Sequence, residues 1–413
     1  MPDNMRPALP LFAGIAVAFI VVQDALNTAV GVQGAATLAL VALAVVMFIK
    51  TKATREGSES SNPLHAWPSA FMWAFVVWAT AGFITSPTTE GLQHVAVWFL
   101  LPAVAALVAM KATTNTITII YPWWRRAAIA AALIYISLAA INGPGVTAFP
   151  YSERGAGWVL VSAMVLLFAK VIFERESLWP LMIVGTAVVL SLSRTPIAIM
   201  LGFAAILIIA GRNRSAKNKN PWFARTLLAG SAAIAGVIYL FTSFTSISNR
   251  FSQGDGYTLF GVEINASGRD KIWTLTTDLW KENIWFGNGP GAAQRYITDY
   301  YDASIAHPHN EYLRFLADTG VVGLALWILG MGGLLFGAVK RLRNSRIAQD
   351  RTIHGAAILS LLLILGASTT DNPTITVYQT VIYATVLGLS MSRARVAENT
   401  DRPTHVAQLD ATR

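Results

Sequence analysis

The feature that most constrains this chain is a series of long apolar runs that contain almost no charged residues. A run of roughly 20 apolar residues matches the thickness of a bilayer when it folds as an α-helix. Only 13% of the 413 residues are charged, and 54% are hydrophobic. Soluble domains are usually about one quarter charged. The sequence therefore predicts an all-α membrane protein, because isolated helices satisfy their own backbone hydrogen bonds in lipid.

We place about twelve candidate spans on these apolar runs. The seventh and eighth are separated by residues 193–196 (Ser-Arg-Thr-Pro), because Pro begins or ends helices and Arg is costly in hydrocarbon. The predicted spans are residues 8–24, 29–49, 68–85, 92–110, 127–142, 156–173, 179–193, 196–211, 226–243, 320–338, 354–369 and 373–391.

The positions of Lys and Arg predict the orientation of these spans. With both termini in the cytoplasm, roughly three quarters of the 31 basic residues fall on the inner side, as the positive-inside rule requires. The net charge of +9 would suggest nucleic acid as a partner of a soluble protein. Here membrane topology accounts for the charge, so we expect a membrane location and no nucleic-acid partner.

The predicted organisation has one large segment outside the membrane. Residues 1–243 carry spans 1–9, residues 244–319 form a loop on the outer side, residues 320–391 carry spans 10–12, and residues 392–413 form a cytoplasmic tail. Loops of this length are usually functional or disordered. This one is rich in aromatic residues, which favours a loop with interfacial amphipathic helices. The chain has no cysteine, which excludes disulfides and thiolate chemistry.

Two arginines on the predicted outer side stand at predicted helix starts. Residues 267–270 (Ser-Gly-Arg-Asp) fit a capping box before an amphipathic helix, which puts Arg269 in its first turn. Arg194 precedes Thr195 and Pro196, which suit a helix cap and a first helical position. Arginine beside a helix N-terminus suits phosphate binding. The alternative interpretation is a solvated or lipid-phosphate-facing residue for Arg269, and a snorkelling arginine at a helix end for Arg194.

A third motif, residues 306–312 (Ala-His-Pro-His-Asn-Glu-Tyr), leads into an apolar helix. Histidine is the usual proton-transfer residue near neutral pH. His94, His307 and His309 are the three of the six histidines that fall on the predicted outer side. A histidine that merely starts a helix is the alternative interpretation, and His-x-His alone is a weak metal signature. We expect no metal site here.

The glycine-rich residues 287–291 (Gly-Asn-Gly-Pro-Gly) allow two interpretations. Glycines can cradle a phosphate with backbone amides. They also form turns, and a turn between two interfacial helices is the interpretation we favour.

Together these motifs resemble the O-antigen ligase and polymerase superfamily. The resemblance rests on Arg194 in Ser-Arg-Thr, Arg269 in Ser-Gly-Arg-Asp-Lys-Ile-Trp, Gly-Asn-Gly-Pro-Gly, and His309 in His-Asn-Glu-Tyr-Leu. Gly320 in Gly-Val-Val-Gly-Leu follows. Residues 185–330 carry the resemblance closely, whereas the flanking spans match only in number and hydrophobicity.

The resemblance implies a glycosyltransferase with a GT-C-like fold in the inner membrane of a Gram-negative bacterium. Such enzymes take a glycan from undecaprenyl diphosphate on the periplasmic face and need no metal or other cofactor. The ligase transfers the glycan to the lipid A–core oligosaccharide. The polymerase transfers it to another lipid-linked repeat and usually carries more spans. We therefore expect a ligase, with an O-antigen or exopolysaccharide polymerase as the alternative.

The resemblance and the chemistry of the residues assign the same roles. Without a metal, arginines and helix N-termini must neutralise the departing diphosphate, and Arg194 and Arg269 suit that role. Neutral His309 is the candidate base for the acceptor hydroxyl, in one displacement that inverts the anomeric centre. The candidate supporting residues are His307, Asn310, Arg295 and Arg314.

Two other classes of function are compatible with a chain of many spans. A transporter would place ionisable residues near the bilayer midplane, whereas these spans are nearly free of charge. A non-enzymatic assembly or lipid-binding subunit would not depend on His309 or on the two arginines.

Overall fold

The computed structural model describes residues 11–28, 32–53, 70–113, 115–215, 257–259, 262–264, 269–301 and 307–392. Thirteen helices and one two-stranded hairpin lie in these ranges. The predicted ninth span, residues 226–243, lies outside the described residues, as do Ser267, Gly268 and the tail beyond residue 392.

Each predicted span within the described ranges coincides with a helix, and the helical class predicted from the apolar runs is confirmed. Among the described helices, five contain a segment that is long and apolar enough to cross a bilayer, namely α5, α6, α7, α14 and α15. The number of spans and their orientation remain predictions. The helices that coincide with predicted spans are α1 (Leu11–Thr28), α2 (Val32–Ala53), α4 (Ala70–Thr85), α5 (Thr89–Lys111), α6 (Thr116–Asn142), α7 (Glu153–Glu174), α8 (Trp179–Leu190), α9 (Arg194–Ser215), α14 (Glu311–Asn344), α15 (Ala348–Ala367) and α16 (Val377–Met391).

Four elements lie in the described residues between α9 and α14. Strands β1 (Tyr257–Leu259) and β2 (Val262–Ile264) pair antiparallel, and helices α12 (Arg269–Glu282) and α13 (Ala292–Tyr300) follow. The hairpin is a small departure from the all-α prediction. Residues 287–291 form the turn between α12 and α13, as we predicted.

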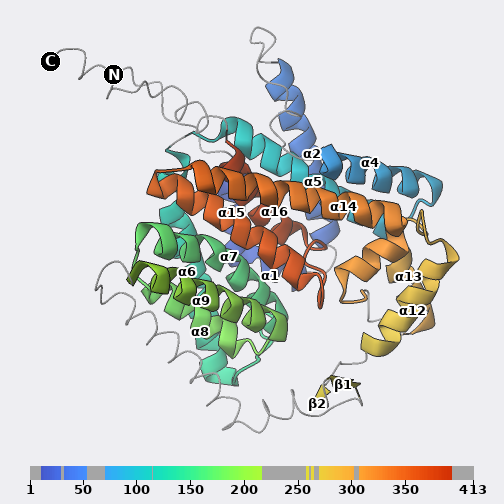
Figure 1. Ribbon diagram of the computed structural model, residues 1–413. Helices are drawn as coiled ribbons and strands as arrows, with labels where there is room; N and C mark the ends of the chain where they lie inside the picture. The colour runs from blue at the N-terminus through green and yellow to red at the C-terminus, as the bar shows by residue number, and fades with distance from the viewer. Residues whose placement is uncertain are drawn as a thin grey trace.

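The helices pack as a bundle in which segments far apart in the sequence lie side by side. Helix α16 packs on α5, α15 packs on α7, and α14 packs on α4 (Figure 1). The α5–α16 contact is close because it is built on a small residue. A β-carbon at Gly388 of α16 would meet the carbonyl oxygen of Ala105 at 2.5 Å, so the backbones approach as they do at small-residue helix contacts in membranes.

Helix α14 bends sharply at Gly320, whose φ of 68° and ψ of −175° are not helical. The bend separates a short segment, residues 311–319, from the long apolar part that follows. A β-carbon at Gly320 would collide with the carbonyl group of Trp285. Only glycine combines this backbone conformation with this contact, so the bend and the α12–α13 turn hold each other in place.

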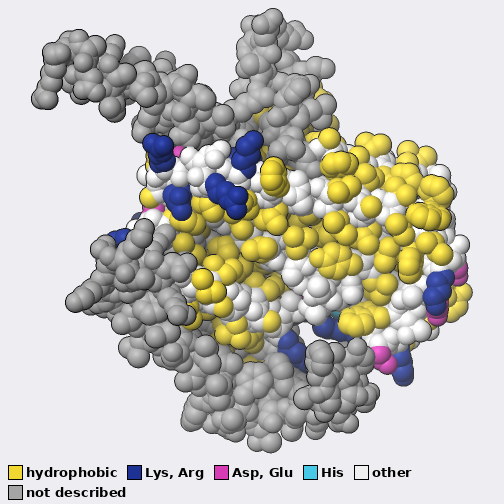
Figure 2. Space-filling view, viewed as in Figure 1, with side chains coloured by type: hydrophobic (Ala, Val, Ile, Leu, Met, Phe, Trp, Pro, Cys, Tyr) yellow, Lys and Arg dark blue, Asp and Glu magenta, His cyan; other side chains and the backbone are white. Residues whose placement is uncertain are grey.

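The surface divides into a hydrophobic band and a basic end. Hydrophobic side chains cover α4 and α14, and Lys and Arg gather where α14 ends and α15 begins (Figure 2). Exposed large hydrophobic residues on a soluble surface are scattered singly, whereas here they form a band, as lipid-facing surfaces do. The basic end is the one we predict to face the cytoplasm.

Candidate functional site

Three arginines lie in the first turns of three different helices. Arg194 and Arg269 are the first residues of α9 and α12, and Arg154 is the second residue of α7. The predicted position of Arg269 in a first turn is confirmed. The predicted cap of α9 is wrong, because the helix already begins at Arg194 and the Thr195 hydroxyl instead contacts the Thr370 hydroxyl at 3.1 Å.

Asp371, in the loop between α15 and α16, places a carboxylate beside these arginines. Its Oδ1 atom pairs with the Arg154 guanidinium, and its Oδ2 atom accepts a hydrogen bond from Trp158 Nε1 at 3.0 Å. Burial would raise the pKa of Asp371. The neighbouring His309 ring, the Arg154 charge and the hydrogen bond from the Asn372 amide outweigh burial and hold this pKa well below its usual range. Asp371 is therefore ionised at neutral pH.

His309 lies beside this ion pair. Its Nδ1 atom is 2.9 Å from Nη2 of Arg154 and 3.6 Å from Oδ1 of Asp371. Its φ of 52° is in the left-handed region, which histidine tolerates better than most residues. Burial lowers the pKa of His309, and the Arg154 charge lowers it further, against the opposing effect of Asp371. The imidazole is therefore neutral at pH 7.

The Arg154 contact decides which nitrogen of His309 carries the proton. A guanidinium has no acceptor, so it can only donate a hydrogen bond to Nδ1. Nδ1 is then unprotonated, and the proton of the neutral ring lies on Nε2. In this state Nε2 cannot accept a proton from a substrate.

Arg269 shares this region with the other arginines. Burial lowers its pKa, Asp371 raises it, and the charges of Arg154 and Arg194 lower it again. Three arginines and one carboxylate, with His309 neutral, give an excess of two positive charges. Trp273 of α12 donates a hydrogen bond to the Pro308 carbonyl at 2.8 Å, which attaches the helix that carries Arg269 to the histidine segment. The predicted residues Arg194, Arg269 and His309 therefore lie in one site.

The other two predicted outer-side histidines lie at the same end of the bundle. The rings of His94 and His307 are 6.1 Å apart, and His94 Nδ1 is 3.6 Å from Asp318 Oδ2. Burial first, and then the charge of His94, lower the pKa of His307 well below its usual value. No hydrogen bond joins His307 to His309 within the described residues, so no direct contact supports a role for the candidate supporting residue His307 in holding His309.

Arg314, a candidate supporting residue, lies in the interior of the protein. It is fully buried, pairs with Glu311 and donates to the Thr374 hydroxyl at 3.3 Å. Its guanidinium lies 5.3 Å from the ring centroid of Trp98. Asn372 also donates to Glu311, at 2.8 Å. Through these hydrogen bonds, Arg314 and Glu311 join the start of α14 to the loop that carries Asp371.

The remaining two candidates have different surroundings. Asn310 is the N-cap of α14, and its side chain accepts a hydrogen bond from the Leu313 amide at 3.0 Å. This cap fixes the backbone directly after His309. Arg295, on α13, is half-buried, and its Nη1 atom has no partner among the described residues.

Arg154 and Asp371 were not predicted as site residues. Asp371 stands in a short polar stretch, residues 369–372, between two predicted spans, and an acid there was a usable signal. Ser152 accepts a hydrogen bond from the Gly155 amide at 2.9 Å and caps α7. Arg154 therefore stands behind a helix cap, as a phosphate-binding arginine would.

Comparison with known proteins matches these motifs to one family. Residues 179–328, about a third of the chain, match the O-antigen ligase family. The chain is 24% identical over 293 residues to an O-antigen ligase of Pseudomonas aeruginosa strain PAO1, a match that covers 67% of this chain and 64% of that protein. The resemblance to the superfamily is therefore confirmed. The matched segment contains Arg194, Arg269 and His309, while Arg154 and Asp371 lie outside it.

Proposed function

We propose, from the similarity of residues 179–328 to the O-antigen ligase family, that this membrane protein is an O-antigen ligase. It transfers a glycan from undecaprenyl diphosphate to the lipid A–core oligosaccharide on the periplasmic face of the inner membrane. The observation that carries the proposal is the cluster of Arg154, Arg194 and Arg269 around Asp371, beside neutral His309.

The cluster suits a diphosphate leaving group. In the transfer, the acceptor oxygen bonds to the anomeric carbon while the bond from that carbon to the diphosphate oxygen breaks. The electron pair of the broken bond stays on the diphosphate. Three guanidinium groups in helix first turns, with an excess of two positive charges, stabilise that developing charge without a metal ion. A single displacement of this kind inverts the anomeric configuration.

His309 receives the proton of the acceptor hydroxyl after a change of tautomer. The side chain of Arg154 is 46% exposed, so an incoming phosphate can reach it and draw it away from His309. His309 Nδ1 can then carry the proton and donate it in a hydrogen bond to Asp371, which leaves Nε2 unprotonated. Arg154 thereby couples donor binding to activation of the base.

The decisive experiment is transfer from a lipid-linked glycan by purified protein, with two acceptors in competition. A ligase glycosylates lipid A–core, whereas a polymerase extends a second lipid-linked repeat. The variant His309→Ala should lose activity on the order of 10²-fold or more while remaining folded. Normal ligation by that variant would remove His309 as the base, and absence of any transfer by the parent protein would reject the ligase proposal.

A further inference from the structure

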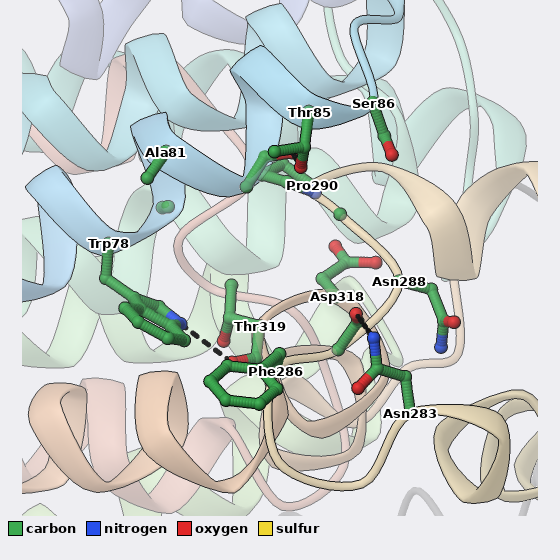
Figure 3. Close-up of a pocket in the computed structure, with 14 residues that line it drawn as sticks. Trp78, Ala81, Thr85, Ser86, Asn283, Phe286, Asn288, Pro290, Asp318 and Thr319 are labelled. Carbon is green, nitrogen blue, oxygen red and sulfur yellow. Dashed lines mark hydrogen bonds between the residues drawn. The ribbon is translucent and has the colours of Figure 1, made fainter.

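A cavity of about 460 Å³ lies between the outer end of α4, the α12–α13 turn and the bend of α14 (Figure 3). Its volume is in the range of small-ligand sites. One side is apolar and is formed by Trp78, Ala81 and Phe286. The other side carries Asn283 and Asn288, with hydroxyl groups from α4 nearby.

The walls of the cavity are fixed by hydrogen bonds and close backbone contacts. Trp78 Nε1 donates to the Thr319 carbonyl at 2.9 Å. A β-carbon at Gly287, which has a φ of 75°, would meet the backbone nitrogens of Thr319 and Gly320 at 2.5 Å. The turn is therefore seated directly on the bend of α14, and the cavity has little freedom to collapse.

The polar wall presents hydrogen-bond acceptors. The amide group of Asn283 donates to the Gly287 carbonyl at 2.7 Å, and that of Asn288 donates to the Leu279 carbonyl at 2.8 Å. Both side chains are thereby oriented with their NH₂ groups toward the backbone. Within the described residues, neither Oδ1 atom accepts a hydrogen bond. A ligand that matches this wall must donate, as sugar hydroxyls do.

The charge of the lining excludes a phosphate. None of the described residues that line the cavity is Lys or Arg. Its one carboxylate, Asp318, already accepts hydrogen bonds from the amides of Gly291 at 3.1 Å and Ala293 at 2.8 Å. An uncharged polyhydroxyl group with an apolar face fits this lining, whereas the diphosphate belongs with the arginines.

The cavity lies between a set of exposed hydrophobic residues and the segment that leads to His309. Ile284 and Trp285 lie between the lining residues Asn283 and Phe286 in the chain, and Ile284, Trp285 and Phe286 are 43%, 62% and 63% exposed. The carbonyls of Ile284 and Trp285 accept hydrogen bonds from the α14 amides of Val321 and Val322, and the Phe286 ring lies 5.7 Å from that of Trp78 on α4. Aromatic residues of this kind lie at membrane interfaces. The segment 311–319 leads from His309 to the cavity, a distance on the order of 15 Å at 1.5 Å per helical residue.

We propose that this cavity binds sugar residues of the acceptor glycolipid, a few sugars away from the hydroxyl that reacts. The inference rests on the proposed ligase function and names a separate subsite for its acceptor. Trp78 and Phe286 contact the apolar face of a sugar, while Asn283 and Asn288 accept its hydroxyl protons. The lipid part of the acceptor remains in the leaflet beside Ile284 and Trp285.

The proposal is tested by a substitution that fills the cavity and removes no packing contact. Ala81 lines the cavity and is exposed, so Ala81→Trp occupies the space. Ala74 is also exposed and lies two turns earlier on α4, away from the cavity, so Ala74→Trp is the matched control. The measurements are the KM for lipid A–core, the KM for the lipid-linked donor, and hydrolysis of the donor by water.

We expect Ala81→Trp to raise the KM for lipid A–core about tenfold or more, with the donor KM and donor hydrolysis unchanged, and Ala74→Trp to behave as the parent. A raised donor KM instead would assign the cavity to the donor glycan and overturn the inference. Unchanged kinetics would overturn it as well. If the parent transfers no glycan, the ligase proposal fails, and direct binding of core oligosaccharide to the parent and to Ala81→Trp still decides the cavity.

Discussion

Replacing Asp371 by Asn is the sharpest test of the catalytic proposal. The change keeps the shape of the side chain and removes the charge that lies 3.6 Å from His309 Nδ1. In the proposed mechanism, His309 becomes an imidazolium as it takes the acceptor proton, and Asp371 stabilises that charge. The variant therefore loses stabilisation that the transition state needs and the resting enzyme does not.

The size of the effect follows from the geometry. Two unit charges 3.6 Å apart attract by about 4–5 kcal/mol at an effective dielectric constant of about 20. If the proton is about half transferred in the transition state, about 2 kcal/mol is lost, which is roughly 30-fold in rate. Asparagine can also donate to Nδ1 and hold the unproductive tautomer, which adds to this loss. We expect kcat to fall by at least about 30-fold.

Donor binding should respond in the opposite direction. Without Asp371 the three arginines keep their charges and lose their anionic partner, so the site becomes more positive by one unit. The donor diphosphate should bind as tightly as before or more tightly. Intact donor binding also demonstrates that the variant is folded.

The assay is initial-rate transfer by purified protein in nanodiscs, with donor and acceptor varied separately. Asp299→Asn is the matched control, because Asp299 is an exposed carboxylate on α13. A kcat for Asp371→Asn within about threefold of the parent would refute the role of Asp371. Weaker donor binding with unchanged kcat would show that Asp371 supports phosphate binding and does not support His309 as the base, which would refute the proposed roles.

Three further predictions follow from the same site. Arg269→Lys should lower transfer on the order of 10²-fold, because a point charge cannot grip phosphate bidentately; the control is Lys271→Arg on the same helix, and unchanged donor binding and rate would remove Arg269 from the phosphate site. The kcat/KM for acceptor should fall as pH decreases, because protonated His309 cannot act as a base; burial and the Arg154 charge lower its pKa, so the half-loss should lie below pH 6.5, and a half-loss above that value contradicts the assignment. A chelator should leave the purified enzyme fully active, whereas a loss of activity that Mg²⁺ restores would contradict transfer without a metal.

The sequence predicted those parts of the molecule that depend on local patterns. Apolar runs long enough for a bilayer became helices, because that constraint acts on each segment separately. Arg269 was located in a helix first turn, because capping is also a property of a few adjacent residues. The turn at residues 287–291 was predicted for the same reason.

The parts that depend on packing between distant segments were not predicted. Arg154 and Asp371 are 217 positions apart in the chain, and only the packing of α7 on α15 and the following loop brings them together. The pairing of Arg314 with Glu311 is local in the sequence, but the burial of this pair depends on Asn372 and Thr374 from that same loop and was not predicted. The cavity beside Trp78 likewise needs three separate segments to form its walls.

The short segment 311–319 has a consequence for specificity. It begins beside His309, is fixed at its start by the buried pair of Glu311 and Arg314, and meets the cavity at Asp318 and Thr319. This segment therefore holds the proposed acceptor subsite at a fixed distance from His309. A fixed distance of this kind would select acceptors by the number of sugars that span it. If the cavity binds the acceptor as proposed, the sugar that is extended would be the one whose distance from the cavity matches the length of this segment.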